Sequence, residues 1–542
     1  MRIPPIGLAV LALLALSGCK PRTDAPAATG LRVLRISQRN EPDDLDPAVA
    51  ALPDDFFVIR ALSEGLIVPT ARAEAPAPAA ADRWAVSSDG LVWRFHLDPR
   101  AQWSNGEPVT AADFVASYRR ALDPATAAPH ADLFFAVVNA RAFAAGQLTD
   151  FARVGFAAPH PDELVVTLER PTPRFLDYVA SGPWIPTNPR VVARFGRQWT
   201  RPENFVGNGP FILTEWRPNQ RIAVSQNPRY RAAASIQIDR MQFVRFDDDN
   251  AEERAYRAGE VDVTMKVPTS KLDTYARERP AELHHAPLAE TRFLAFNVRR
   301  PPLGDWRVRQ ALALAIDRVQ LVADVVRGGQ EPAYRLVPPE LRPAADTATQ
   351  LGAGRAVAGP DDAGAVAEAQ RLLAAAGFPG GALWPALELS GWSGSPVLEA
   401  IQAMWEKNLG LEVAIVNREA RTHLAAARAG RYDIAFLPLI PQVADPLPTL
   451  GSFVTGAGDN YPQWSDAQFD GLIAAAARAP EADRRQQLLQ AAETRLLAQC
   501  PLTPLYFNAR NWAMRPYVHG WREDALWTRY YPSLWLDPVR AP

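Results

Sequence analysis

The sequence predicts a multidomain α/β protein that carries an inserted α+β domain. A chain of 542 residues is too long for one hydrophobic core and favours about two to four domains. Between residues 363 and 416, helix-like and strand-like segments alternate and glycines follow the helices, which is typical of a mostly parallel sheet. Residues 82–186 instead combine two strand patterns with one helix, which indicates a compact α+β unit.

The composition is that of an ordinary globular protein. Hydrophobic residues make up 48% of the chain and charged residues 22%, so neither disorder nor a membrane-spanning body is indicated. The 58 basic and 60 acidic residues leave a net charge of -2, which gives no support to a nucleic-acid-binding surface. Fifteen tryptophans are more than a core of this size needs, so we expect some of them to line a cleft.

Residues 1–18 have the pattern of an export signal. A short basic start is followed by the apolar stretch Ile3 to Leu16, which is too short for a transmembrane span of about 20 residues. The next residues, Leu-Ser-Gly-Cys ending at Cys19, resemble the lipobox of bacterial lipoproteins, which implies cleavage before Cys19 and lipid attachment to its sulfur. The alternative is an ordinary signal peptide with an incidental cysteine. Residues 19–30 are predicted to be a flexible tether.

The body of the chain begins with a strand and a linker. Leu31 to Ser37 alternates in strand fashion, and the turn-rich stretch Glu41 to Pro47 follows it. Pro69 to Ala81 is rich in alanine and proline. We expect it to be the first crossing into a second domain.

The helix in the second domain has clear boundary signals. Thr110 and Asp113 form a capping box, and Pro124 ends the segment, so a helix from about Ala111 to Leu122 is predicted. Its apolar residues share one face at helical spacing, which indicates packed scaffold rather than a catalytic loop. Predicted strands lie on either side of it, at 91–97 and 164–168.

The remaining elements follow from the same patterns. Strands rather than a helix follow the glycine turn at 207–209, and a phosphate cradle needs a helix N-terminus, so no nucleotide site is expected there. The predicted strands are 212–216, 221–226, 293–298, 387–389 and 411–416, and the predicted helices are 306–318, 363–376 and 397–409.

Several motifs, in order along the chain, resemble the bacterial extracellular solute-binding proteins of family 5, which serve peptide ABC importers. The resemblance covers about Leu31 to Tyr506 and is closest to the oligopeptide-binding branch. The motifs are Glu-Pro-Asp-Asp-Leu-Asp-Pro at 41–47, Trp-Ser-Asn-Gly-Glu-Pro-Val-Thr-Ala-Ala-Asp-Phe-Val at 103–115, Gly-Asn-Gly-Pro-Phe at 207–211, Phe-Asn at 296–297, and Val-Arg-Gln-Ala-Leu-Ala-Leu-Ala-Ile-Asp-Arg at 308–318.

The resemblance implies a fold of the class II-like periplasmic-binding-protein kind, in which two hinged α/β lobes close over a ligand and carry an inserted α+β domain. Lobe I would be discontinuous and would return near Cys500 to complete its sheet. The expected ranges are the signal peptide 1–18, the tether 19–30, lobe I at 31–81, 187–288 and 500–542, the inserted domain II at 82–186, and lobe III at 289–499.

The function implied by the resemblance is binding rather than catalysis. The protein would be the substrate-binding component of an ABC importer, capturing oligopeptides or peptide-like solutes and delivering them to the permease subunits. It would need no cofactor or metal, act as a monomer, and lie in the periplasm or cell envelope, with its lipid anchor as its only attachment to the membrane.

One departure from the family pattern concerns the ligand's ammonium group. In oligopeptide binders, an aspartate in an Ala-Asp-Tyr-x-(Asp/Glu)-Pro segment binds the ammonium group. When Asp445-Pro446 is aligned with the end of that segment, Gln442 stands at the position of this aspartate. A glutamine can hydrogen-bond an amine but cannot neutralise it. Either Asp445 reaches the ligand through a different loop path, or the ligand is not held by a free N-terminus. Asp445 is the candidate ligand partner, with the alternative that it only caps the turn at Pro446.

Aromatic and amide side chains supply the other candidates. The register puts Phe436 where oligopeptide binders often have an arginine, and Trp392 stands on a loop after a strand end, where an exposed aromatic fits a cleft wall. His130 falls near an aromatic that these proteins use from the inserted domain, although a plain surface histidine is the alternative. The residues that match a segment bordering the ligand are Asn460, Tyr461 and Trp464.

The sequence shows no local catalytic or metal-binding motif. It has no His-Glu-x-x-His, Gly-x-Ser-x-Gly, Cys-x-x-Cys or P-loop pattern, and its seven histidines lack ligand spacing. Two alternatives stay open at this point: an extracytoplasmic hydrolase assembled from distant residues, and a family member that has lost ligand binding and serves as an envelope scaffold or chaperone.

Overall fold

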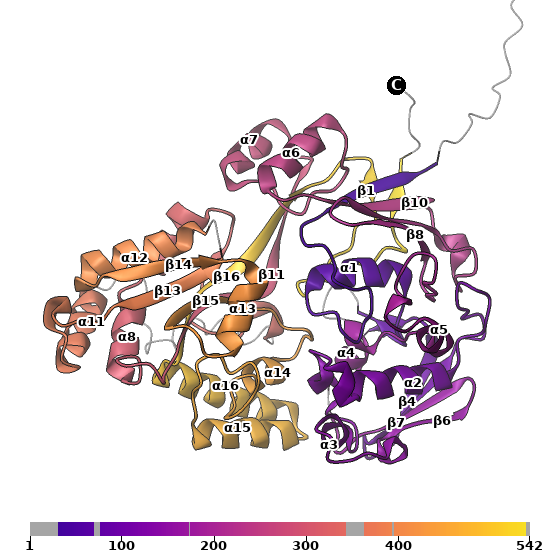
Figure 1. The fold of residues 1–542 in the computed structure, drawn as a ribbon, viewed down its shortest axis with the longest axis horizontal. Helices are drawn as coiled ribbons and strands as arrows, with labels where there is room; N and C mark the ends of the chain where they lie inside the picture. Colours follow the sequence, from indigo (N-terminus) through magenta and orange to yellow (C-terminus); the bar gives the residue numbers. More distant parts are fainter. Residues whose placement is uncertain (1–30, 70–75, 173, 343–362, 393–394, 538–542) are drawn as a thin grey trace, which may run out of the picture.

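The protein folds into two bodies joined by long strands (Figure 1). The computed structural model describes residues 31–69, 76–172, 174–342, 363–392 and 395–537. The predicted signal peptide, the tether and Cys19 lie outside the described residues. One body comprises lobe I and the inserted domain, and lobe III forms the other (Figure 1). The predicted class of two α/β lobes with an inserted α+β domain is thereby confirmed.

Lobe I is built on a four-stranded sheet in the order β1-β10-β9-β8, in which β1 is parallel to β10 and the other neighbours are antiparallel. Leu34 and Ile36 of β1 are fully buried, as the alternation of that segment predicts. The strands are β1 (Val33–Gln38), β8 (Phe211–Arg217), β9 (Arg221–Gln226) and β10 (Arg240–Arg245), and the helices are α1 (Pro53–Leu62), α5 (Pro189–Phe195), α6 (Asp249–Ala258) and α7 (Leu272–Glu278).

The inserted domain is an antiparallel sheet covered by α2 (Figure 1). Helix α2 spans Ala111–Leu122, the predicted range, and its capping box between Thr110 and Asp113 is present. Its buried face packs into an aromatic core that includes Tyr118 and Trp184, whose ring centroids lie 4.9 Å apart. The other elements are β4 (Ala81–Val86), β5 (Val92–Leu97), β6 (Phe156–His160), β7 (Glu163–Thr167), α3 (Ala140–Ala144) and α4 (Phe175–Val179), with the small pair β2 (Ile67–Val68) and β3 (Ala77–Pro78) at its entrance.

Lobe III has a six-stranded sheet in the order β12-β16-β11-β15-β13-β14. The expectation of a mostly parallel sheet is wrong, because only β13, β14 and β15 run parallel to one another, while β11, β12 and β16 pair antiparallel. The helical crossovers that predict parallel pairing join only the first group. The strands are β11 (Leu283–Phe296), β12 (Glu331–Pro332), β13 (Leu387–Trp392), β14 (Val413–Arg418), β15 (Ile434–Leu439) and β16 (Leu502–Ala513).

The helices of lobe III surround this sheet (Figure 1). Helix α8 ends at Leu314, before the predicted end at Arg318, because the carboxylate of Asp317 accepts the N–H of Gln320 at 2.9 Å and starts a new turn. Helix α12 ends at Leu409, as predicted, and Gly410 caps it in a left-handed conformation (φ 69°). The helices are α8 (Trp306–Leu314), α9 (Arg318–Gln320), α11 (Ala363–Ala375), α12 (Pro396–Leu409), α13 (Ala420–Arg428), α14 (Pro446–Gly451), α15 (Ala467–Arg478) and α16 (Ala482–Gln499).

Strands β11 and β16 connect the two bodies (Figure 1). They pair over most of their length, but the register shifts between Pro287 and Thr291. On one side of this irregularity β11 also pairs with β15 of lobe III; on the other side the end of β16 meets lobe I, where Ala513 O accepts the N–H of Thr264 at 2.8 Å. The C-terminal hairpin of β17 (Val518–His519) and β18 (Trp535–Leu536) then packs into the lobe I core.

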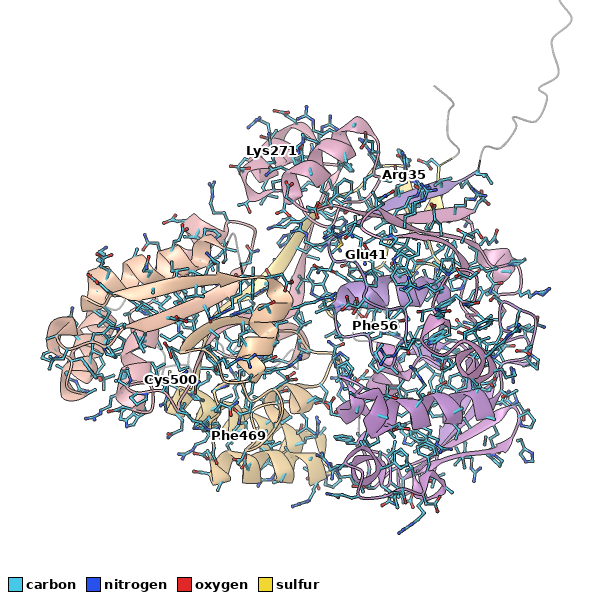
Figure 2. All side chains as sticks on the ribbon, viewed as in Figure 1. Arg35, Glu41, Phe56, Lys271, Phe469 and Cys500 are labelled. Carbon is cyan, nitrogen blue, oxygen red and sulfur yellow. The ribbon has the colours of Figure 1, made fainter. Side chains whose placement is uncertain are left out.

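The single thiol of the described chain is buried in lobe III. Cys500 lies inside that lobe, and Phe469 of α15 lies in its second core, next to Trp464 (Figure 2). Burial raises the pKa of the Cys500 thiol to about 12, so it stays protonated. Within the described ranges, no helix is both long enough and apolar enough to cross a membrane.

Candidate ligand-binding site

A cavity of about 430 Å³ lies where lobe I, the inserted domain and lobe III meet. Its volume falls in the range of about 300 to 1,000 Å³ that is usual for small-molecule sites. The lining residues are Arg60, Pro69, Pro76, Arg174, Asp177, Ala180, Ser181, Ala289, Glu340, Leu341, Gln442, Val443, Ala444, Asp524, Ala525, Leu526 and Thr528. The lining includes both neutral and charged side chains, so the cavity suits an amphipathic solute.

Lobe I contributes the last turn of α1 and the segment 524–528. The carboxylate of Asp524 accepts the backbone N–H of Leu526 at 2.9 Å and of Thr528 at 2.8 Å, which fixes the turn. The preceding Glu523 forms a buried ion pair with Arg510 of β16. Arg60 of α1 donates from Nη2 to the carbonyl of Ala180 at 3.2 Å, which connects lobe I to the inserted domain.

The inserted domain contributes residues around α4. Arg174 donates from Nε to the carboxylate of Asp177 at 2.5 Å, so these two charges balance each other at the cavity wall. The hydroxyl of Ser181 donates to the carbonyl of Tyr178 at 2.6 Å, which closes the end of the helix. Phe56 of α1 fills the space beside Gly182, where a Cβ would approach its ring to 2.3 Å, and Figure 2 shows it between α1 and the inserted domain.

Lobe III contributes Glu340 and Leu341, and a buried carboxylate on α16 positions their segment. Glu493 accepts the N–H groups of Leu336 and Val337, both at 2.8 Å, and it also pairs with Arg335 at 2.8 Å. Ala289, at the irregularity of β11, donates its N–H to the carbonyl of Ala525 at 2.8 Å. The hinge strand therefore forms part of the cavity itself.

The loop after β15 brings Gln442, Val443 and Ala444 to the cavity. Asp445 then caps α14 by accepting the N–H of Leu447 at 3.0 Å. Its fully buried carboxylate also accepts hydrogen bonds from Arg485 at 2.7 and 2.9 Å. The hydroxyl of Tyr178, from the inserted domain, donates to the same carboxylate at 3.2 Å. Asp445 thus fixes the loop and connects two parts of the molecule.

Burial shifts the charges that line the cavity. It raises the pKa of Asp524 to about 6 and raises the pKa of Glu340, whose Oε2 has no hydrogen-bond partner among the described residues. Burial also lowers the pKa of Arg60 to about 10, which still leaves the guanidinium charged at neutral pH. Arg60 therefore stays charged at neutral pH, whereas Asp524 and Glu340 bind a proton at a higher pH than exposed carboxylates do.

Of the sequence-predicted ligand residues, Gln442 lines the cavity. The prediction that Asp445 contacts the ligand stays untested, and its carboxylate is already bonded to Arg485, Tyr178 and the α14 backbone. His130 lies apart from the cavity lining, with Nε2 3.4 Å from the carbonyl oxygen of Ala51.

The remaining predicted residues lie within lobe III. Trp392 stacks obliquely on Phe436, with ring centroids 4.9 Å apart, and the guanidinium of Arg292 lies 4.8 Å from the Trp392 ring. Asn460 donates to the carbonyls of Val454 and Trp464, so it holds a loop together. Tyr461 and Trp464 belong to the second hydrophobic core of this lobe.

Sequence reasoning missed every charged residue of the lining, namely Arg60, Arg174, Asp177, Glu340 and Asp524. These residues come from four separate stretches of chain. Arg60 lies two residues before the segment Leu-Ser-Glu-Gly-Leu at 62–66, whose resemblance to the family's N-terminal pattern is a local signal near it.

A second contact joins the lobes away from the cavity. Arg421 of α13 forms an ion pair with Asp43 and donates from Nη2 to the carbonyl of Glu41 at 3.4 Å. Both partners lie in the turn-rich segment after β1. Together with the Tyr178–Asp445 hydrogen bond, this pair connects lobe III to the other body of the molecule.

Comparison with known proteins agrees with this geometry. The family description "Bacterial extracellular solute-binding proteins, family 5 Middle" matches residues 75–461. The chain is 33% identical to the probable deoxycholate-binding periplasmic protein YgiS of Escherichia coli, over 92% of each chain. It is 30% identical to the periplasmic oligopeptide-binding protein OppA of the same species, over 98% of each chain.

Solved structures show the same fold. The Escherichia coli murein tripeptide-binding protein MppA is 27% identical and superposes with a TM-score of 0.83, covering 93% of this chain and 98% of that one. The unliganded open form of MppA gives a TM-score of 0.69, at the same 27% identity and over 93% and 97% of the two chains. The lobes of this protein are therefore arranged differently from those of that open form.

Proposed function

Because the chain belongs to the bacterial extracellular solute-binding proteins of family 5, a non-enzymatic family of ABC transport, we propose that it captures an oligopeptide or a peptide-like solute between its lobes. The bound solute would pass unchanged to the permease subunits of an importer. The observation that carries the proposal is the cavity that lobe I, the inserted domain and lobe III line together where they meet.

We also propose where the protein acts. An export signal at 1–18 and a lipid on Cys19 would hold it at the membrane surface in the periplasm or envelope, next to the permease. The periplasmic names of its relatives support the compartment. Mass spectrometry of the protein purified from membranes tests the anchor: a diacylglycerol mass on an N-terminal Cys19 is expected, and an unmodified mature N-terminus would contradict it.

A second ligand class has a specific observation in its favour. Gln442 stands in the cavity without a charge, so it cannot neutralise a peptide's ammonium group. The relative named for deoxycholate binding is 33% identical, slightly more than the oligopeptide-binding relative. A bile-acid-like solute, which has no ammonium group, is therefore the alternative to a peptide.

Calorimetry with purified protein tests the proposal. We expect saturable binding of short peptides or of deoxycholate, and recovery of the ligand intact after denaturation of the complex. Small-angle scattering should show the same compact form with ligand. If no member of either class binds, the remaining interpretation is a family member that serves the envelope as a scaffold without a ligand.

A further inference from the structure

Arg60 lines the cavity without an ion-pair partner in the described part of the chain, and the nearby charge of Asp524 offsets only part of the cost of its burial. Its guanidinium donates one hydrogen bond, to the carbonyl of Ala180, and among the described residues no carboxylate oxygen lies within 4 Å of it. A charge removed from bulk water without a partner is costly, and a ligand group of opposite charge would offset that cost. The side chain stays partly exposed because it faces the cavity.

The acids around Arg60 make their hydrogen bonds with other groups, and Asp524 acts on Arg60 only through its charge. Asp524 is bonded to two backbone N–H groups of its own turn, and Asp177 is paired with Arg174. Glu340 stands on the lobe III side, where burial raises its pKa and so favours the uncharged form. An uncharged carboxyl group can also donate a hydrogen bond to an anion.

The rest of the lining is neutral and mostly apolar. Gln442 can donate or accept a hydrogen bond, but it carries no charge. The apolar side chains are Pro69, Pro76, Ala289, Leu341, Val443, Ala444, Ala525 and Leu526. This combination of one strong cation with an apolar surface fits a ligand that has a carboxylate at one end and an apolar body.

We infer that Arg60 binds the carboxylate of the transported solute, and that the cavity selects amphipathic carboxylates. The inference rests on the proposed function and assigns the recognised chemistry within that site. Two sources share this chemistry, the C-terminal carboxylate of a short peptide and the side-chain carboxylate of a bile acid. Arg60 is a specificity-determining residue in either case.

The first arm of the test changes the ligand and uses the parent protein, so its result does not depend on whether a variant folds. Titrations compare each carboxylate with its neutral form: an apolar tripeptide with its C-terminal amide, and deoxycholate with its methyl ester. A charge-assisted hydrogen bond in this setting corresponds to about a 10- to 100-fold difference in affinity. We expect that loss for whichever class binds.

The second arm repeats the titrations with Arg60→Gln. This variant should bind the carboxylate about 10- to 100-fold more weakly than the parent protein and should no longer distinguish it from its neutral form. Arg174→Gln is the matched control, because Arg174 lines the same cavity but is paired with Asp177. It should keep most of the discrimination. Circular dichroism and thermal melting verify that both variants are folded.

The outcomes separate the role of Arg60 from the proposed transport function. Equal affinity of acid and neutral forms for the parent protein overturns the assignment of Arg60 and leaves the proposed transport function standing. Discrimination that persists in Arg60→Gln also overturns it. If neither class binds the parent protein, the proposed function falls and the inference with it. If Arg60→Gln fails to fold, the comparison of ligands with the parent protein decides alone.

Discussion

Asp445 shows how one buried carboxylate can have a structural role close to a ligand site. It is fully buried, caps α14 and accepts hydrogen bonds from Arg485 and Tyr178. Removing one member of a buried ion pair leaves the other charge without compensation, which costs about 3 to 5 kcal/mol. The neighbouring Gln442, by contrast, faces the cavity.

We therefore expect Asp445→Asn to lower the free energy of unfolding by about 3 to 5 kcal/mol, because Arg485 stays buried. Tyr178→Phe is the control and should lower it by about 1 kcal/mol, since it removes one hydrogen bond. Urea denaturation followed by tryptophan fluorescence measures both. A normal stability for Asp445→Asn, together with a selective loss of affinity for peptides with free amines, would instead assign Asp445 to the ligand.

Asp524 predicts how binding depends on pH. Its pKa is raised to about 6, so the carboxyl group is mostly protonated at pH 5.5 and ionised at pH 7.5. An anionic ligand near Arg60 is then repelled less at the lower pH. We expect the affinity for an N-acetylated tripeptide, whose carboxylate titrates below about pH 4, to rise about three- to tenfold from pH 7.5 to 5.5.

Asp524→Asn should bind this tripeptide with nearly the same affinity at both pH values, close to the parent protein's value at pH 5.5. Glu340 also has a raised pKa and faces the same cavity. Glu340→Gln in the same background shows whether it accounts for any remaining slope. An affinity that falls on acidification of the parent protein would contradict the assignment.

At the scale of elements, helices were predictable because their signals are local. The boundaries of α2 follow from Thr110, Asp113 and Asp123-Pro124, and the end of α12 follows from Gly410. The pairing of β11 with β16 could not be predicted, because the paired residues are more than 200 positions apart. The local sequence of a strand does not indicate which other strand it pairs with. The cavity was missed for the same reason, since it combines short pieces of six distant stretches.

The capping box of α2 allows a test of this local control. Asp113 accepts the N–H of Thr110 at 2.9 Å and Nε1 of buried Trp103 at 3.1 Å. Asp113→Ala should therefore lower the free energy of unfolding by about 2 kcal/mol, through loss of the cap and an unsatisfied indole N–H. Thermal melting of the protein measures the effect.

Asp123→Ala is the matched control for Asp113→Ala. Asp123 is exposed, and its carboxylate accepts one hydrogen bond from the described residues, the N–H of Ala125 at 2.9 Å. Its removal should cost about 0.5 kcal/mol or less. Equal losses for the two variants would show that the buried bonds of Asp113 add nothing to the stability of the domain.

At the scale of the whole molecule, the structure has its lobes in contact. The Tyr178–Asp445 hydrogen bond and the Arg421–Asp43 ion pair both cross between the bodies, and the TM-score of 0.69 to the open form of MppA is well below the 0.83 found for the other MppA structure. Contacts that exist only in one arrangement stabilise that arrangement.

Arg421→Ala should shift the unliganded protein toward an open arrangement. An exposed ion pair contributes about 0.2 to 1 kcal/mol, so the population ratio and the apparent ligand affinity should change by at most about fivefold. Small-angle scattering should show a larger radius of gyration without ligand and recovery of the parent value with ligand. Arg371→Ala, which removes an exposed pair within α11, should leave both measurements unchanged.

The long pair β11 and β16 also determines when this protein can finish folding. Residues after 500 complete the cores of both bodies: Leu502, Leu505 and Tyr506 in one, and Trp512, Tyr531 and Leu534 in the other. A chain that is synthesised from its N-terminus therefore lacks part of the lobe I core and of both lobe III cores until its last forty residues or so emerge, whereas the core of the inserted domain needs no residue after 500. Both lobes therefore stay incomplete for most of the synthesis, which favours passage of the chain through a narrow pore before the two lobes fold.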